Sequence, residues 1–174
     1  MGIERTLAII KPDAVEKNLV GEVIRRYEKE GFRIVSMKML KADEKLLKKH
    51  YPDSMASAVG QKSANAGDPE AKKDPTSFGF KVLKWLRDFM SSGPVVPMIL
   101  EGENVIQRAR EVTGFTDPSQ AKPGTIRGDF GQDSILKANQ EKRPVKNLIH
   151  MSGNKEEAAA EIAIWFRPEE IVRD

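Results

Sequence analysis

The sequence contains no cysteine, which excludes disulfide bridges, thiolate metal sites and a cysteine nucleophile. It also has no apolar run approaching the roughly 20 residues that a membrane-spanning helix needs. The N-terminus lacks the basic flank and apolar segment of a secretion signal. We therefore expect a cytoplasmic protein that does not enter a membrane.

Histidine and aromatic residues are also scarce. Aromatic residues make up 6% of the 174 residues, and the only histidines are His50 and His150. The lysine-rich segment 38–49 has no interleaved aromatic residues that could stack on bases, so a solvated helix face explains it better than a nucleic-acid site. The net charge of +3 favours anionic partners only weakly.

What is present is typical of one globular domain, with 39% apolar and 32% charged residues. Short apolar runs predict four strands, near residues 6–10, 32–41, 95–100 and 147–150. Helical periodicity and capping residues predict helices near residues 19–31, 43–51, 80–90, 104–112 and 154–166. This order predicts an α+β sandwich with helices on one face of the sheet. Pro97 lies inside the third apolar run and predicts an edge position or a bulge.

Two polar stretches interrupt this pattern, Pro52–Ser77 and Gly131–Lys146. The first consists mainly of Ala, Gly, Ser, Lys, Asp and Pro without a period, which predicts a long loop inserted into a single domain, residues 1–174. Such a loop has little apolar surface to offset the entropy of ordering. We expect it to be mobile without a bound ligand and to lie near the mouth of the site.

His150 is the first candidate for chemistry, because it ends the apolar run NLIH and precedes a run of helix formers. A lone histidine is more often structural or exposed than catalytic. A neutral imidazole is nevertheless a good nucleophile near pH 7 and can form covalent intermediates. Glu161, on the helix expected next, is at a plausible separation to hold the second ring nitrogen.

Three cations form a second group of candidates: Lys11 at a strand end, Arg110 beside an apolar helix face, and Arg127 after a Pro-Gly turn. Each alone is adequately explained as a solvated charge. Together they suit a phosphate chain, which needs several cations to neutralise the charge that develops during transfer. Neither a Walker A motif nor a glycine-rich kinase loop is present. Phosphate binding would therefore depend on side chains and on a metal brought by the nucleotide.

Several longer motifs resemble nucleoside diphosphate kinases: IIKPDAV, LVGEVIRRYEKEGF, SGPVV, KPGTIRGDF and NLIH, followed by IWF and PEE. The resemblance covers nearly the whole chain apart from its two insertions. It implies a ferredoxin-like βαββαβ fold with a four-stranded antiparallel sheet covered by helices. It also implies transfer of the γ-phosphate of ATP or another nucleoside triphosphate to His150, and then to a nucleoside diphosphate, with Mg²⁺ on the nucleotide. The resemblance further implies a homo-oligomer, either a hexamer or a tetramer built from dimers.

The resemblance also implies roles for individual residues. Lys11 and Asn147 would contact the sugar hydroxyls and the catalytic phosphate region, and Tyr51 would lie close to the histidine. Arg110, Thr116 and Arg127 would hold the phosphates, while Glu161 would orient His150. An aromatic residue in the helical segment before SGPVV stacks on the base in the family. Counting back without a gap places Val82 there, with Leu83 and Phe80 as alternatives.

The sequence departs from the family pattern in three ways: Met151 and Gly153 follow the histidine, Pro97 interrupts a strand, and the two polar stretches are longer than in compact members. None removes a predicted catalytic group, so the enzyme interpretation stands. The alternative is a catalytically silent module of the same fold that binds nucleotide or nucleic acid. Such a module would have little chemical reason to keep the cations, the asparagine and the histidine together. A side role in transferring phosphate to proteins through the same histidine is also compatible with the sequence.

Overall fold

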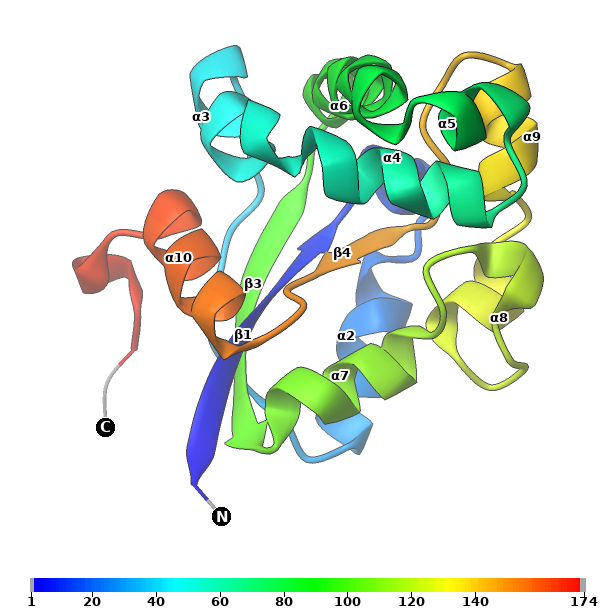
Figure 1. The fold of residues 1–174 in the computed structure, drawn as a ribbon. Helices are drawn as coiled ribbons and strands as arrows, with labels where there is room; N and C mark the ends of the chain where they lie inside the picture. Colours follow the sequence, from blue (N-terminus) through cyan, green and yellow to red (C-terminus); the bar gives the residue numbers. More distant parts are fainter. Residues whose placement is uncertain (1, 173–174) are drawn as a thin grey trace.

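The computed structural model describes residues 2–172 and contains a four-stranded antiparallel sheet. In the order β2-β3-β1-β4, its strands are Arg33–Met37, Val96–Glu103, Ile3–Ile10 and Ile149–Met151. The fold predicted from the sequence, an α+β sandwich of the ferredoxin-like kind, is therefore confirmed (Figure 1). Within the described part of the chain, no helix is long and apolar enough to cross a membrane.

Helices fill the connections between the strands. The α-helices, in chain order from α1 to α10, are Pro12–Glu16, Val20–Lys29, Glu44–His50, Ala56–Asn65, Pro69–Lys73, Pro75–Ser91, Val105–Thr113, Ile126–Phe130, Ile135–Gln140 and Lys155–Trp165. Short 3₁₀ turns, η1 to η3, are Asp53–Met55, Pro118–Gln120 and Pro168–Glu170. The capping predictions are confirmed at α3 and α10. Asp43 accepts a hydrogen bond from the Leu46 N–H, and Asn154 accepts one from the Glu157 N–H.

The sheet is covered on both faces, not on one as predicted. Residues Leu7, Ala8, Ile9 and Ile10 of β1 are all fully buried. Ala8 and Ile10 belong to a core cluster with residues of α2 and α7, whereas Leu7 and Ile9 belong to a second cluster with residues of α3, α6 and α10. A continuous apolar run is typical of a strand buried on both sides, because a half-exposed strand would alternate with polar residues.

The expectation of a loop at Pro52–Ser77 is wrong. This stretch forms η1, α4, α5 and the beginning of α6. Asp68 and Asp74 cap α5 and α6 with their side chains, and a proline follows each cap at the first helical position. Helix α4 contacts α5, α6 and α9 (Figure 1). The polar stretch Gly131–Lys146 likewise contains a helix, α9, which Ser134 caps.

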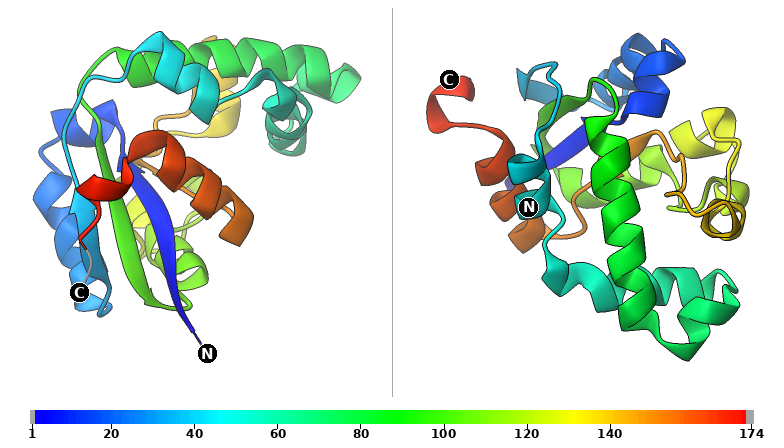
Figure 2. Two further views of the ribbon diagram at one scale, coloured as in Figure 1. Left: turned by 90° about the vertical axis from the view of Figure 1, so that its left-hand side faces the viewer. Right: turned by 90° about the horizontal axis from the view of Figure 1, so that it is seen from above.

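The crossing of α4 and α6 explains why hydropathy missed α4 and the first turn of α6 (Figure 2, right). A Cβ atom on Gly60 would lie 1.6 Å from the Pro75 carbonyl oxygen, and one on Gly79 would lie 1.8 Å from the Ala56 carbonyl oxygen. The two helices therefore approach with backbone against backbone. Small residues bury surface here without producing an apolar period in the sequence.

Pro97 lies in an interior strand, so the predicted edge position is wrong. Strand β3 pairs with β1 on one side and with β2 on the other. The pairing of β2 with β3 shifts its register between Ile34 and Ser36. Beyond the end of β2, the Lys38 N–H donates to the Pro97 carbonyl oxygen at 3.2 Å. Proline has no N–H to return this bond, and it is tolerated where the ladder with β2 has already ended.

Candidate active site

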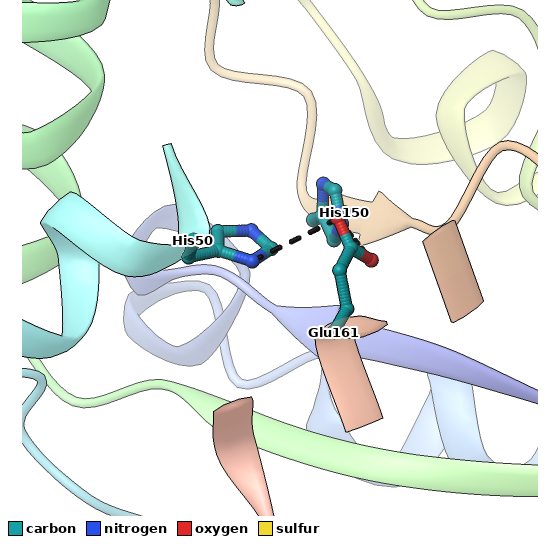
Figure 3. Close-up of side chains that lie close together, drawn as sticks. All are labelled: His50, His150 and Glu161. Carbon is teal, nitrogen blue, oxygen red and sulfur yellow. Dashed lines mark hydrogen bonds and ion pairs between the residues drawn. The ribbon is translucent and has the colours of Figure 1, made fainter. Parts of the chain in front are cut away.

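The side chain of His150 is held by a carboxylate (Figure 3). His150 Nε2 lies 3.0 and 2.9 Å from the two carboxylate oxygens of Glu161 on α10. The Ser152 hydroxyl donates to the same carboxylate at 2.5 Å. Burial raises the pKa of Glu161, but the charge and hydrogen bond of His150 outweigh it and lower the pKa to about 2. Glu161 is therefore ionised at neutral pH.

This contact determines which nitrogen of His150 is available. A carboxylate only accepts hydrogen bonds, so Nε2 carries the proton that faces Glu161. In the neutral ring Nδ1 then has the free lone pair. The side chain of His150 is 17% exposed, so a ligand can reach it. The resulting geometry is a nucleophilic nitrogen on one side of the ring and a fixed negative charge on the other.

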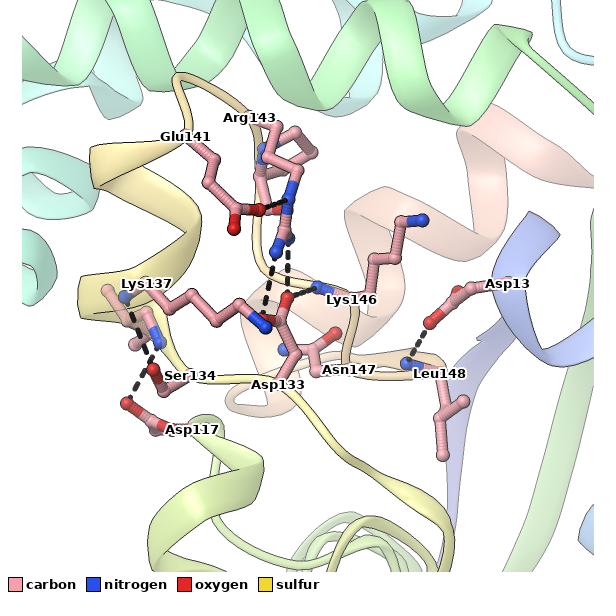
Figure 4. Close-up of polar contacts among 12 residues, drawn as sticks. Asp13, Asp117, Asp133, Ser134, Lys137, Glu141, Arg143, Lys146, Asn147 and Leu148 are labelled. Carbon is pink, nitrogen blue, oxygen red and sulfur yellow. Dashed lines mark hydrogen bonds and ion pairs between the residues drawn. The ribbon is translucent and has the colours of Figure 1, made fainter.

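A tight turn at Leu148, which Figure 4 shows beside Asp13, precedes β4, the strand that carries His150. The Ile149 N–H donates to the Asn147 carbonyl oxygen at 2.8 Å across Leu148, whose φ of 73° is in the left-handed region. Such a three-residue turn is strained for a residue with a branched side chain. Its backbone is fixed from outside, because the Leu148 N–H donates to Asp13 at 3.1 Å and its carbonyl oxygen accepts from the Lys11 N–H at 2.8 Å.

The Lys11 side chain is buried, with 4% of its surface exposed. Its Nζ donates to the Asn147 side-chain oxygen at 2.8 Å, and the Asn147 amide donates to the Thr116 carbonyl oxygen at 2.9 Å. Burial, followed by the charge of Arg127, lowers the pKa of Lys11 from 10.5 to about 8. The predicted residues Lys11, Asn147 and Thr116 thus form one hydrogen-bonded chain beside the turn that carries His150.

Arg127 is 7% exposed and lies behind the same turn. Its guanidinium donates to three backbone carbonyls: those of Asn147 and Gly114, each at 3.0 Å, and that of Ile149. A guanidinium has five N–H donors, so two remain for a ligand. Burial, against the opposing effect of Tyr27 and with a smaller contribution from Arg110, lowers the pKa of Arg127 to about 10. Arg127 therefore holds the turn and still carries its charge at neutral pH.

Arg110 on α7 is exposed, and one of its guanidinium nitrogens lies 3.4 Å from the Ser152 carbonyl oxygen. Within residues 2–172, Lys11, Arg110 and Arg127 form no ion pair with a carboxylate. Most other arginines of the surface do, as Arg143 does with Asp133 at 2.6 Å (Figure 4). The predicted cations therefore constitute a group of uncompensated positive charges, which an anionic ligand would neutralise.

The remaining predicted residues differ in their placement. Tyr51 is buried, and its ring centroid lies 6.2 Å from that of His150. Burial raises the pKa of Tyr51, so its phenol stays protonated. Val82 is 8% exposed and packs with Phe78 in the cluster formed by α4, α5 and α6, which speaks against its predicted stacking on a base. Leu83 is fully buried, and only Phe80 has an exposed side chain, at 49%.

Two site residues were not singled out from the sequence. The ring of His50, at the end of α3, lies 4.4 Å from that of His150 between centroids. The side chain of Lys62 on α4 forms no ion pair or hydrogen bond among the described residues. Desolvation, followed by the charge of Arg110, lowers its pKa. A histidine at a predicted helix end was visible in the sequence, but nothing local indicated its distant neighbour. Lys62 was hidden in the supposed loop.

His50, His150 and Glu161 are also the one group of potential metal ligands in the described part of the chain. Their ligand atoms lie within 4.8 Å of one another. These atoms are already engaged, since Glu161 accepts from His150 and His50 Nδ1 accepts from Trp165 Nε1 at 3.2 Å. Mg²⁺ prefers oxygen ligands in octahedral geometry, so this cluster does not suit it.

Comparison with known proteins agrees with this geometry. Residues 4–64 and 78–171 match the family described as nucleoside diphosphate kinase. The unmatched interval contains α5. The nucleoside diphosphate kinase of Pyrobaculum aerophilum is 43% identical over 182 residues, covering 99% of this chain and 100% of that protein. Nucleoside diphosphate kinase A 2 of Bos taurus is 43% identical over 169 residues, covering 97% and 90%.

Solved structures show the same likeness. The crystal structure of an NDP kinase from Pyrobaculum aerophilum has a TM-score of 0.92 and 41% identity, covering 99% of this chain and 100% of that one. A transition-state mimic of nucleoside-diphosphate kinase from Borrelia burgdorferi, with bound vanadate and ADP, has a TM-score of 0.85 and 36% identity, covering 99% and 92%. The enzyme class predicted from the sequence is confirmed, and the chain belongs to the nucleoside diphosphate kinase family.

Proposed function

We propose that this chain transfers the γ-phosphate of a nucleoside triphosphate to a nucleoside diphosphate through a phosphohistidine on His150. One observation carries the proposal. His150 turns its Nε2 to an ionised carboxylate and keeps Nδ1 as the nucleophile, in a chain of this family. A covalent phosphoenzyme intermediate lets the two nucleotides use the same cationic site in turn, because their phosphate chains need not be bound at the same time.

In the first half-reaction, Nδ1 of His150 attacks the γ-phosphorus and a nitrogen–phosphorus bond forms. The bond from the γ-phosphorus to the β–γ bridging oxygen breaks, and the nucleoside diphosphate leaves with that electron pair. The ring then holds a proton on Nε2 and the phosphoryl group on Nδ1, and the Glu161 carboxylate stabilises the positive charge. In the second half-reaction, a β-phosphate oxygen of another diphosphate attacks the phosphorus. The nitrogen–phosphorus bond breaks and its electron pair returns to Nδ1.

The cations give this transfer its electrostatic support. Arg110, with a guanidinium largely free of protein partners, and Arg127, with two free donors, can each hold two phosphate oxygens. Lys11 adds a charge that Asn147 positions. Thr116, whose carbonyl oxygen orients Asn147, and Tyr51, close to the His150 ring, complete the predicted set. For the base-stacking residue, Phe80 replaces Val82 in the proposal because only its ring is exposed.

Glu161 is engaged by His150 and Asp13 accepts from the Leu148 N–H, so these carboxylates would not form a cage for Mg²⁺. The metal would be held by the nucleotide phosphates, where it neutralises and orients the phosphate chain. The substrates proposed are ATP and other nucleoside tri- and diphosphates. A homo-oligomer built from dimers and a cytoplasmic location, both expected from the sequence, belong to the same proposal. Nucleic acid is not required.

The direct test is labelling with ATP alone. Wild-type protein should gain one phosphate that is acid-labile and base-stable, and peptide mass spectrometry should place it on His150 and not on His50. His150→Ala should lose both the label and the exchange of phosphate between nucleotides, because the attacking nitrogen is gone. Transfer by His150→Ala at the wild-type rate would contradict the covalent mechanism.

Arg110 can be tested against a neighbour on the same helix. Lysine keeps the charge of Arg110 but cannot donate to two phosphate oxygens in the planar geometry of a guanidinium. Arg110→Lys should therefore lower kcat/KM, with a loss of transition-state stabilisation of roughly 1 to 3 kcal/mol. Arg108→Lys is the matched control, because Arg108 instead donates to the Glu30 carbonyl oxygen and covers the Phe32 ring. Equal kinetics in the two variants would remove Arg110 from the phosphate site.

Lys11 gives the reaction a pH dependence. Its pKa of about 8 means that free enzyme loses this positive charge as the pH rises through 8. We expect kcat/KM, which reports the free enzyme, to decline above about pH 8. A bound phosphate favours the charged amine, so the corresponding decline in kcat should occur at higher pH. Lys11→Gln should abolish the decline of kcat/KM above about pH 8. If the decline persists unchanged in this variant, it belongs to another titrating group.

A further inference from the structure

His50 is enclosed by aromatic rings. It is 3% exposed, and its ring meets three others close to edge-on. The centroid distances are 4.4 Å to Tyr51, 4.4 Å to His150 and 5.5 Å to Trp165, with interplanar angles of 69°, 82° and 81°. The nucleophilic ring therefore has Glu161 at its Nε2 and the His50 ring beside it (Figure 3). Rotation of His150 would have to displace a buried side chain.

Trp165, on α10, fixes the protonation of His50. Its indole Nε1–H donates to His50 Nδ1 at 3.2 Å. An indole nitrogen can only donate, so Nδ1 must offer its lone pair and the proton of the neutral ring lies on Nε2. His50 Nε2 is buried without a hydrogen-bond partner among the described residues. The indole bond thus selects one tautomer, and it favours the neutral ring because a protonated Nδ1 could not accept it.

The neutral state matters because the Glu161 carboxylate is close to both rings. Its Oε1 lies 3.8 Å from His50 Nδ1 and 3.0 Å from His150 Nε2. A positively charged His50 would compete for this carboxylate and would repel the charge that develops on His150 during phosphorylation. A neutral His50 with its Nδ1 occupied by Trp165 does neither.

We propose that His50 is a positioning residue for the phosphoryl transfer: burial and the Trp165 bond together keep it neutral, and it holds the His150 ring while leaving Glu161 to that ring alone. This inference rests on the proposed function of His150. The groups that face His50 are His150 from β4, Glu161 and Trp165 from α10, the adjoining Tyr51 and, at longer range, Lys11. Burial, followed by the charge of His150, lowers the pKa of His50 well below 6.5, against the attraction of Glu161.

Histidine-selective ¹⁵N NMR tests the protonation state directly, because the chain has only two histidines. Between about pH 5 and 8, His50 of the wild type should keep the signals of a neutral ring protonated on Nε2. Trp165→Phe keeps a ring in place but removes the donor, so His50 should lose its single tautomer and begin to titrate. The matched control is Trp85→Phe on α6, whose ring packs on Phe78 away from the histidines, and it should leave the His50 signals unchanged.

Kinetics separate positioning from folding. Trp165→Phe should lower kcat by about tenfold relative to Trp85→Phe, with little change in the KM for nucleotide, because it disturbs the nucleophile but not the phosphate cations. The deficit should deepen as the pH falls, since more of the variant then carries a charged His50. A uniform loss at all pH values would indicate a merely structural role and would overturn the inference.

Three outcomes distinguish this inference from the function on which it rests. Absence of phosphohistidine in the wild type would overturn the proposed function, whatever His50 does. Normal phosphorylation of His150, together with a wild-type His50 that titrates near pH 6.5, would overturn only the inference. So would a Trp165→Phe variant that matches Trp85→Phe in both its kinetics and its His50 signals.

Discussion

The contact between the ionised Glu161 carboxylate and His150 Nε2 is the interaction on which the site depends. It sets the tautomer of the nucleophile, and it supplies the charge that balances a phosphorylated ring. Its geometry requires β4 and α10 to hold fixed positions. The Asn154 cap begins α10 soon after the strand ends, and Ser152 joins the two elements through its own bond to Glu161. His50 and Trp165 support the same contact from its other side.

The opposite side of the site is built on unpaired positive charge. Burying Lys11 and Arg127 without carboxylate partners costs free energy, which the lowered pKa values of both side chains reflect. Hydrogen bonds to the Asn147 side chain and to backbone carbonyls offset part of this cost. The same bonds fix the strained turn at Leu148 that presents His150. The residues proposed to bind phosphate thus also shape the backbone of the nucleophile, and a bound phosphate chain would neutralise the charges that folding leaves uncompensated.

Much of the fold could be predicted because its signals are local. The uninterrupted apolar run of β1 and the caps Asp43 and Asn154 placed their elements correctly. The predicted Lys11, Asn147 and Glu161 do converge around His150. Residues 52–77 could not be predicted, because α4 and α6 pack through glycine backbones and leave no apolar period. Counting through that insertion also placed the expected stacking residue at Val82, whose burial speaks against this role. The contact of His50 with His150 joins segments far apart in the sequence, so no short-range sequence pattern predicts it.

The central claim is that Glu161 occupies Nε2 and leaves Nδ1 to carry the phosphoryl group. The most direct measurement is NMR of the ¹⁵N-histidine-labelled protein after reaction with ATP alone, detecting the coupling between phosphorus and the ring nitrogens of His150. The account predicts a phosphorus–nitrogen bond at Nδ1, with the proton retained on Nε2. A phosphoryl group on Nε2, or on any residue other than His150, would contradict it.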